Sequence, residues 1–195
     1  MPIVTLPGGQ VRDEIRQPIY DTIDLTPAVS PVGTTRFFSN VQGKSLAKTN
    51  LRQNNLLETA VSFRIQGLCL DSQNDNIANA GVLSVLMIRS SLRLHVGEKD
   101  YWSGCSRYAA GRMWSMAETT VAATSVLLQQ YGFSAIQPVV FQGKHVIDIN
   151  PLQSFFAEWV IDPLIAVELA AATPAAATTV SFAFSLKGLQ RRPVQ

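Results

Sequence analysis

The chain contains few charged residues, and this low content limits the kinds of surface that the protein can have. Only 15% of its 195 residues are charged, against about 25% in an average soluble domain. A surface with so few charges favours coverage by partner proteins or by copies of the same chain. The alternative is a neutral exterior built from serine, threonine, asparagine and glutamine.

Cysteine and long apolar segments are scarce as well. Two cysteines, Cys69 and Cys105, are too few for a disulfide framework. Cys69 stands among apolar residues and is expected in the core, and a bond between the two remains open. The start of the chain lacks the basic and apolar regions of a secretion signal, and no segment reaches the ~18 apolar residues of a membrane span. These features predict folding in a reducing cytoplasm.

Residue types that carry catalysis are sparse too. The two histidines, His95 and His145, are far apart in the sequence, and no cluster of carboxylates accompanies either one. A metal-binding β-barrel needs several histidines and a carboxylate that converge on one ion. Neither cysteine has a histidine close in sequence to activate it. We therefore predict that the protein is not an enzyme and uses no metal or cofactor.

Two long segments with alternating apolar residues, 60–70 and 179–189, are the clearest structural signal in the chain. A period of two predicts strands with one face in a core. Gly67 and Gly188 stand near the ends of these strands, where glycine suits a bulge or a sharp exit. We expect the two strands to be neighbours in one sheet. The residues predicted to face the core are Val61, Phe63, Ile65, Val180, Phe182, Phe184 and Leu186; those predicted to face away are Ser62, Arg64, Gln66, Ser181, Ser185 and Lys187.

Shorter strands and two helices fill the rest of the chain. Turn-forming Asn50, Asn54 and Asn55 predict an ordered polar loop over 43–57. A short helix is predicted over 77–88. A second helix is predicted over 116–130, because Ser115 and Glu118 have the spacing of a capping box and apolar residues follow at helical intervals. The predicted short strands are 18–25, 35–42, 92–96 with a hairpin return at 101–102, 138–142, 145–149 and 154–161.

These elements predict an all-β protein. Prolines spread through residues 1–34 indicate an extended N-terminal arm that leans on its own domain or on a neighbour. Residues 35–195 are predicted to form one domain, an antiparallel β-sandwich of single jelly-roll type with one or two short helices.

Positive charge is unevenly distributed, although the net charge is only +2. No acid lies between Asp24 and Glu58, and a second basic stretch stands near the C-terminal end, at Lys187, Arg191 and Arg192. Such stretches can contact nucleic-acid phosphates or an anionic lipid surface; the alternative is ordinary solvated charge. The candidate genome- or membrane-facing residues of the first stretch are Arg36, Lys44, Lys48 and Arg52.

The order of these features resembles that of a known family. A proline-rich arm precedes Thr49-Asn50-Leu51, the hairpin at 92–102 follows, and the chain then passes through 147–151 into a last strand that ends near Arg191-Arg192-Pro193-Val194. This layout resembles the jelly-roll capsid proteins of tailless icosahedral bacteriophages, including those with an internal membrane. Many major capsid proteins of this kind have two jelly rolls, whereas this chain has length for one. A major, a vertex or a minor role therefore remains open.

The resemblance implies a structural protein of a virion that assembles in the host cytoplasm with copies of itself and with other capsid proteins into an icosahedral shell. The genome or an internal membrane is a further expected partner, through the basic stretch. The alternative is a ligand- or carbohydrate-binding sandwich, such as a receptor-binding protein, in which aromatic residues stack on sugars. The candidate sugar-stacking residues are Tyr101, Trp102, Tyr108 and Trp114.

Overall fold

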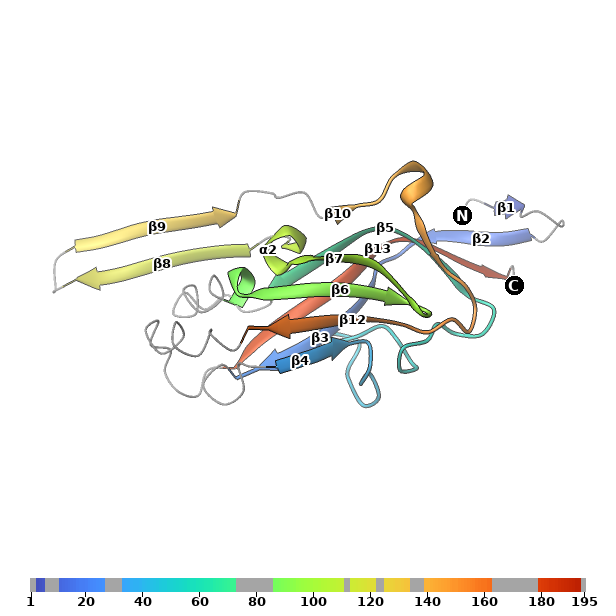
Figure 1. The fold of residues 1–195 in the computed structure, drawn as a ribbon, viewed down its shortest axis with the longest axis horizontal. Helices are drawn as coiled ribbons and strands as arrows, with labels where there is room; N and C mark the ends of the chain where they lie inside the picture. The colour runs from blue at the N-terminus through green and yellow to red at the C-terminus, as the bar shows by residue number, and fades with distance from the viewer. Residues whose placement is uncertain are drawn as a thin grey trace.

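The protein is an all-β sandwich of two antiparallel sheets (Figure 1). The computed structural model describes residues 3–5, 11–26, 33–72, 86–110, 113–121, 125–133, 139–162 and 179–193. The large sheet contains β1 (Ile3–Thr5), β2 (Val11–Arg16), β3 (Ile19–Leu25), β5 (Ser62–Ser72), β10 (Val139–Val140), β11 (Ile147–Ile149) and β13 (Val180–Pro193). The small sheet contains β4 (Gly33–Phe37), β6 (Ser90–Val96), β7 (Lys99–Cys105) and β12 (Phe155–Ile161).

The long strand β13 organises the large sheet. On one side it pairs with β5 through ten residue pairs, from Phe182↔Ser72 to Arg191↔Ser62. On its other side it pairs first with β3 and then with β2. Strands β10 and β11 both pair with the far side of β5 and form one edge of the sheet. The predicted pairing of the first and last long strands is therefore confirmed.

Both glycines lie at an irregularity in this pairing, as the sequence predicts. The register between β5 and β13 shifts between Lys187 and Gly188, and Gly67 is the partner of Lys187. A Cβ on Gly188 would lie 1.9 Å from the carbonyl oxygen of Arg64, and one on Gly67 would lie 2.7 Å from that of Val139. Only glycine permits so close an approach of neighbouring backbones at a bulge.

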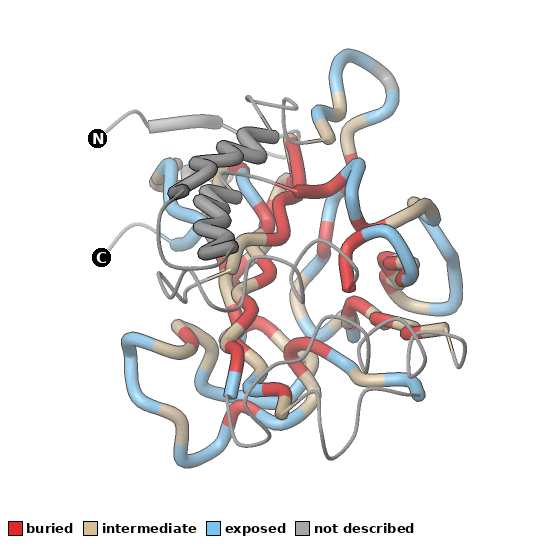
Figure 2. Tube along the Cα trace, turned by 90° about the vertical axis from the view of Figure 1, so that its left-hand side faces the viewer, coloured by how far each residue is buried: buried red, intermediate tan, exposed pale blue. Residues whose placement is uncertain are grey.

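The core lies between the two sheets (Figure 2). All seven residues predicted to face it are buried, and the six predicted to face away are more exposed. Trp159 of β12 and Phe182 of β13 join the sheets, with ring centroids 4.7 Å apart. The indole nitrogen of Trp159 donates to Ser106 Oγ at 3.0 Å, which satisfies the polar atom that a buried tryptophan brings with it.

The predicted helix over 116–130 is wrong. Residues there form an antiparallel hairpin of β8 (Met113–Val121) and β9 (Ser125–Phe133), in register from Met113↔Phe133 to Val121↔Ser125. Thr119, Thr120 and Val121 are β-branched, so they lose side-chain freedom in a helix and favour a strand. A capping box contributes only about 1 kcal/mol, which did not outweigh that preference.

Other boundaries differ by a few residues. Strand β4 ends at Phe37, because Phe38 adopts a left-handed backbone conformation with φ 69°. The hairpin return predicted at 101–102 is part of the longer strand β7 (Lys99–Cys105), which the short helix α2 (Ser106–Ala109) follows. The strand predicted at 145–149 begins after the 3₁₀ helix η2 (Gly143–His145). Of the helix predicted over 77–88, residues 86–88 are helical, and 77–85 lie outside the described residues.

Part of the predicted arm belongs to the sandwich. Strand β3 lies within residues 1–34 and pairs with β13 along all seven of its residues. Pro18 lacks the N–H that a continuous ladder needs, and it separates β3 from β2, which continues along the same side of β13. The arm thus leans at least in part on its own domain, one of the two options the sequence left open.

Candidate functional site

Each of the four basic residues singled out in the sequence has a carboxylate partner. Arg36 lies 3.2 Å from Glu158, Lys44 lies 2.7 Å from Asp21, and Arg52 lies 3.2 Å from Glu58. Lys48 pairs with Asp24. The acids come from β3, β12 and the loop before β5, so the gap in acids along the sequence is filled in space. A genome- or membrane-facing role for these residues stays a prediction.

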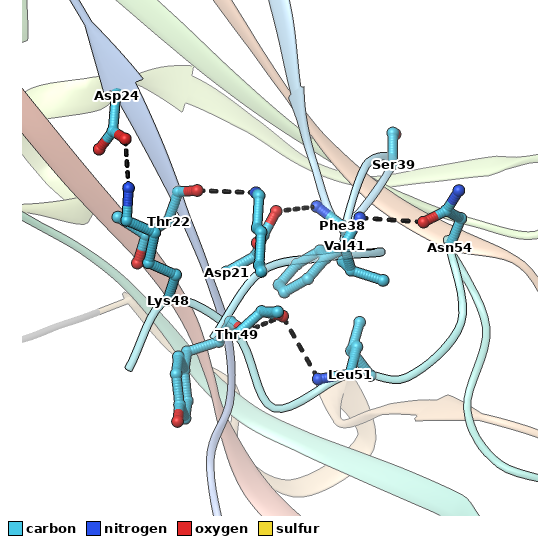
Figure 3. A network of polar contacts seen from close by, with 12 residues as sticks. Asp21, Thr22, Asp24, Phe38, Ser39, Val41, Lys48, Thr49, Leu51 and Asn54 are labelled. Carbon is cyan, nitrogen blue, oxygen red and sulfur yellow. Dashed lines mark hydrogen bonds and ion pairs between the residues drawn. The ribbon is translucent and has the colours of Figure 1, made fainter. Parts of the chain in front are cut away.

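Asp21, which Figure 3 shows beside Phe38, forms an ion pair with Lys44 that anchors the polar loop to the sandwich. Asp21 is fully buried on β3 and accepts hydrogen bonds from the Phe38 backbone N–H and from Lys44 Nζ, each at 2.7 Å. Lys44 Nζ also donates to the Thr22 carbonyl oxygen at 2.7 Å. A buried carboxylate needs hydrogen bonds and an opposite charge to compensate for its lost hydration. The hydrogen bond from the Phe38 N–H to Asp21 also holds Phe38 in its left-handed conformation.

Asparagine side chains fix the rest of the loop, as the sequence predicts. Asn50 accepts from the Tyr20 N–H at 3.0 Å and donates to the Pro18 carbonyl at 2.7 Å. Asn54 accepts from the Val41 N–H at 2.9 Å. Asn55 has a φ of 59°, a left-handed conformation that asparagine tolerates. The loop is therefore ordered and is hydrogen-bonded to the start of β3.

The outer end of the loop is held more loosely. Hydrogen bonds from Lys48 and from Ser181, the latter at 2.6 Å, lower the pKa of Asp24 below its ordinary value. Both members of the Lys48–Asp24 pair are more than a third exposed, so solvent screens much of their attraction. The buried Asp21 pair thus carries the main attachment.

The histidines occupy different surroundings. His95 contacts Asp100, and its ring stacks on Phe156 with centroids 4.4 Å apart. His145 is exposed at the end of η2. Within the described ranges, no three His, Cys, Asp or Glu side chains form a group that could hold a metal ion.

The buried cysteine, Cys69, is not set up as a nucleophile. Cys69 and Cys105 are both free thiols. Burial, together with the neighbouring charge of Asp71, raises the pKa of Cys69 to about 12. The nucleophilic thiolate is therefore strongly disfavoured at Cys69. The bond between the two cysteines that the sequence left open is not formed.

Two hollows open on the surface of the described residues. One, of about 700 Å³, lies beside the free edge of the large sheet and is lined by Tyr101, Phe141, Gln142 and His145, together with Val140, Val146 and Ile147. Tyr101 is 43% exposed there, whereas Trp102 packs against the core and Tyr108 is exposed elsewhere. Trp114 lies on β8. Of the four candidate sugar-stacking residues, the fold therefore places Tyr101 in a hollow.

The second hollow, of about 450 Å³, lies between the polar loop and the ends of β2 and β13, and we call it the loop hollow. It is lined by residues of both basic stretches: Lys44 and Arg52 of the first, and Arg192 of the second. Both basic stretches are visible in the sequence, but no local pattern predicts that they line one hollow. Asp21 was missed as well, although its place on the apolar face of a predicted strand was a visible signal.

Comparisons with models of protein families, with curated proteins and with solved structures found no match. Among the described residues, no helix is both long and apolar enough to cross a membrane.

Proposed function

We propose that the protein is a structural subunit of a bacteriophage capsid and that its sandwich is a single jelly roll. The strand order supports the second part. If β10 and β11 count as one edge strand, the large sheet runs β3-β13-β5-β10/β11 and the small sheet runs β4-β12-β6-β7. In chain order the eight strands are thus arranged 1-8-3-6 and 2-7-4-5, the interleaving expected of two Greek keys in a jelly roll.

The observation that carries the functional part is β structure that extends beyond the sandwich at both ends (Figure 1). At one end β1, β2 and the last residues of β13 run on as a ribbon. At the other, β8 and β9 project, and in the described part of the chain they pair only with each other.

A projecting two-stranded ribbon is marginally stable alone and offers unpaired edges to other strands. The strands β8 and β9 contain a single charged residue, Glu118. Natural proteins protect exposed edges with charge, and this hairpin has little of it. Docking on a neighbouring copy would cover both its edges and its apolar residues, as the repeated contacts of a shell require. A fold alone does not decide function, so these extensions support the proposal more than the jelly roll does.

Assembly of the purified full-length chain tests the proposal. We expect light scattering and electron microscopy to show closed particles or large oligomers that grow with protein concentration. Replacing residues 113–133 with a Gly/Ser segment of equal length should leave a folded monomer. A full-length chain that stays monomeric at every concentration would refute the proposal.

A glycan-binding role is the second candidate, supported by Tyr101 in the hollow at the sheet edge. An exposed aromatic ring beside Gln142 and His145 offers stacking and hydrogen bonding together, and about 700 Å³ is within the range of ligand sites. Saturation-transfer NMR with a panel of oligosaccharides tests it. Binding that Tyr101→Ala abolishes and Tyr108→Ala preserves would favour this role, since Tyr108 lies outside the hollow and is more exposed than Tyr101.

A further inference from the structure

The fold brings together two basic stretches that are separated by most of the chain. Arg52 of the polar loop and Arg192 of β13 line the same loop hollow, with Lys44 beside them. Glu58 is the one acid in the lining, and Asp13 lies opposite Arg192 in the pairing of β2 with β13. Three cations and one acid therefore line this hollow, although the chain as a whole carries a net charge of only +2.

The two arginines are available to a ligand, whereas Lys44 is not. Lys44 Nζ is held by Asp21 and by a backbone carbonyl. Arg52 is 83% exposed, and its partner Glu58 is 55% exposed, so that ion pair is weak and open to exchange. Within the described residues, no ion pair engages Arg192, which is also exposed.

The hollow combines this charge with apolar and polar lining residues. Leu51 and Leu56 are half-buried in the lining, whereas Ile19 and Leu57 are almost fully buried. Gln190 of β13 and Gln17, which lies between β2 and β3, add hydrogen-bonding groups. A ligand that fits must carry an anion beside a flatter, less polar part, within about 450 Å³.

We infer that the loop hollow binds single-stranded nucleic acid, one nucleotide at a time, with its phosphate between Arg52 and Arg192. Guanidinium groups suit phosphate because their planar fork donates two parallel hydrogen bonds. The sugar and base would lie against the half-buried side chains of Leu51 and Leu56, with the two glutamines available to base or sugar edges. Without an aromatic platform in the lining, the contact is expected to depend on phosphate more than on sequence.

A membrane surface fits the hollow less well. Lipid bilayers are bound by surfaces that place apolar side chains outward beside basic residues. Leu46, 75% exposed, is the one strongly exposed large apolar residue in this lining, and the two arginines border a concave surface. Nucleic acid is therefore the ligand that the shape and charge favour.

Fluorescence anisotropy of the full-length protein with a labelled twelve-nucleotide oligo(dT) tests the inference. Arg52→Gln and Arg192→Gln remove one charge each at exposed positions. Arg93→Gln is the matched control, because Arg93 is exposed on β6 and outside the hollow. We expect each hollow variant to weaken binding about tenfold at low salt and to lower the salt-dependence slope by about 1. The control should change affinity less than about twofold.

The possible results separate the ligands. Equal losses in all three variants would overturn the inference, since they would indicate attraction to general surface charge. Binding to vesicles of phosphatidylglycerol and phosphatidylcholine without binding to oligo(dT) would also overturn it. Inorganic phosphate that binds as tightly as the oligonucleotide, when both are compared per phosphate group, would overturn the inference as well, because it would show a site for simple anions. Light scattering in the same buffers reports assembly separately, so a failure here and a failure of the proposed shell function are distinguishable.

Discussion

The two halves of β13 differ although they belong to one strand. Residues 180–186 alternate strictly between buried and half-buried positions and are flanked by β3 and β5. Beyond Gly188, residues 189–193 are half-buried or exposed, and they pair with β2 and the start of β5. The first half builds a core and the second half builds a ribbon. The change from core-forming to ribbon-forming residues occurs at the single bulge at Gly188.

The bulge itself is the most sensitive position in this comparison. A Cβ on Gly188 would lie 1.9 Å from a backbone oxygen that cannot move aside cheaply, so Gly188→Ala should cost at least about 5 kcal/mol or prevent folding. Gly43→Ala is the control, because Gly43 has a φ of 80° and open space around it, and strain alone should cost about 1–2 kcal/mol. Urea unfolding measures both. If the two substitutions lower the free energy of unfolding by the same amount, the close backbone approach at Gly188 is not what makes this position sensitive.

Truncating one apolar side chain in each half should give unequal losses of stability. Phe184 is buried against Phe37, with ring centroids 5.4 Å apart, and Phe184→Ala should cost about 3–5 kcal/mol of unfolding free energy. Leu189 is half-buried in the second half, and Leu189→Ala should cost about 1 kcal/mol. Chemical denaturation tests this, provided that both variants show the same dependence of unfolding free energy on denaturant concentration. Similar losses would mean that the ribbon contributes to the core.

The buried carboxylate opposite Phe184 should matter nearly as much. Asp21 is the partner of Phe184 in the pairing of β3 with β13. Asp21→Asn leaves Lys44 and the Phe38 N–H without an ionised acceptor, which should cost about 2–4 kcal/mol. Asp24→Asn on the same strand breaks a solvent-exposed pair and should cost much less. Thermal melting of both variants tests the ranking, and a larger loss for Asp24→Asn would reverse it.

A smaller effect than that of Asp21→Asn is expected in the ribbon. Arg191 lies 2.8 Å from Glu14 across β13 and β2. Both side chains are only about 15% exposed, so Arg191→Ala leaves Glu14 without its partner and should cost about 1–3 kcal/mol. It should raise amide exchange in β2 while leaving exchange in β3 unchanged. Hydrogen exchange with mass spectrometry resolves the two strands. Faster exchange in β3 would mean that the halves unfold together.

Sequence reasoning succeeded where local patterns settle the structure. Alternating apolar residues identified β5 and β13 and the residues they bury, and the position of Gly188 predicted the bulge. Asn50 and Asn54 indicated the ordered loop, since asparagine stabilises turns through bonds to nearby backbone.

The helix predicted over 116–130 is wrong for a local reason, because the β-branched residues after Glu118 favour the hairpin over the capping-box spacing of Ser115 and Glu118. Other features depend on residues that are distant in the sequence. The partner of Lys44 and the meeting of Arg52 with Arg192 depend on which strands become neighbours, and no local pattern specifies that. The aromatic Tyr101 was identified, but only the fold separates it from Trp102, the next residue, which packs against the core.

The central place of β13 has a consequence for synthesis on the ribosome. Strands β2, β3 and β5 all pair with it, yet they emerge long before residues 180–193 are made. Until then they lack their shared neighbour, and the large sheet cannot close. Pairing across such sequence distances is slow and leaves strand edges open meanwhile. A ribosome that stops early would therefore release an incomplete sheet, which chaperones and proteases can recognise before it joins any assembly.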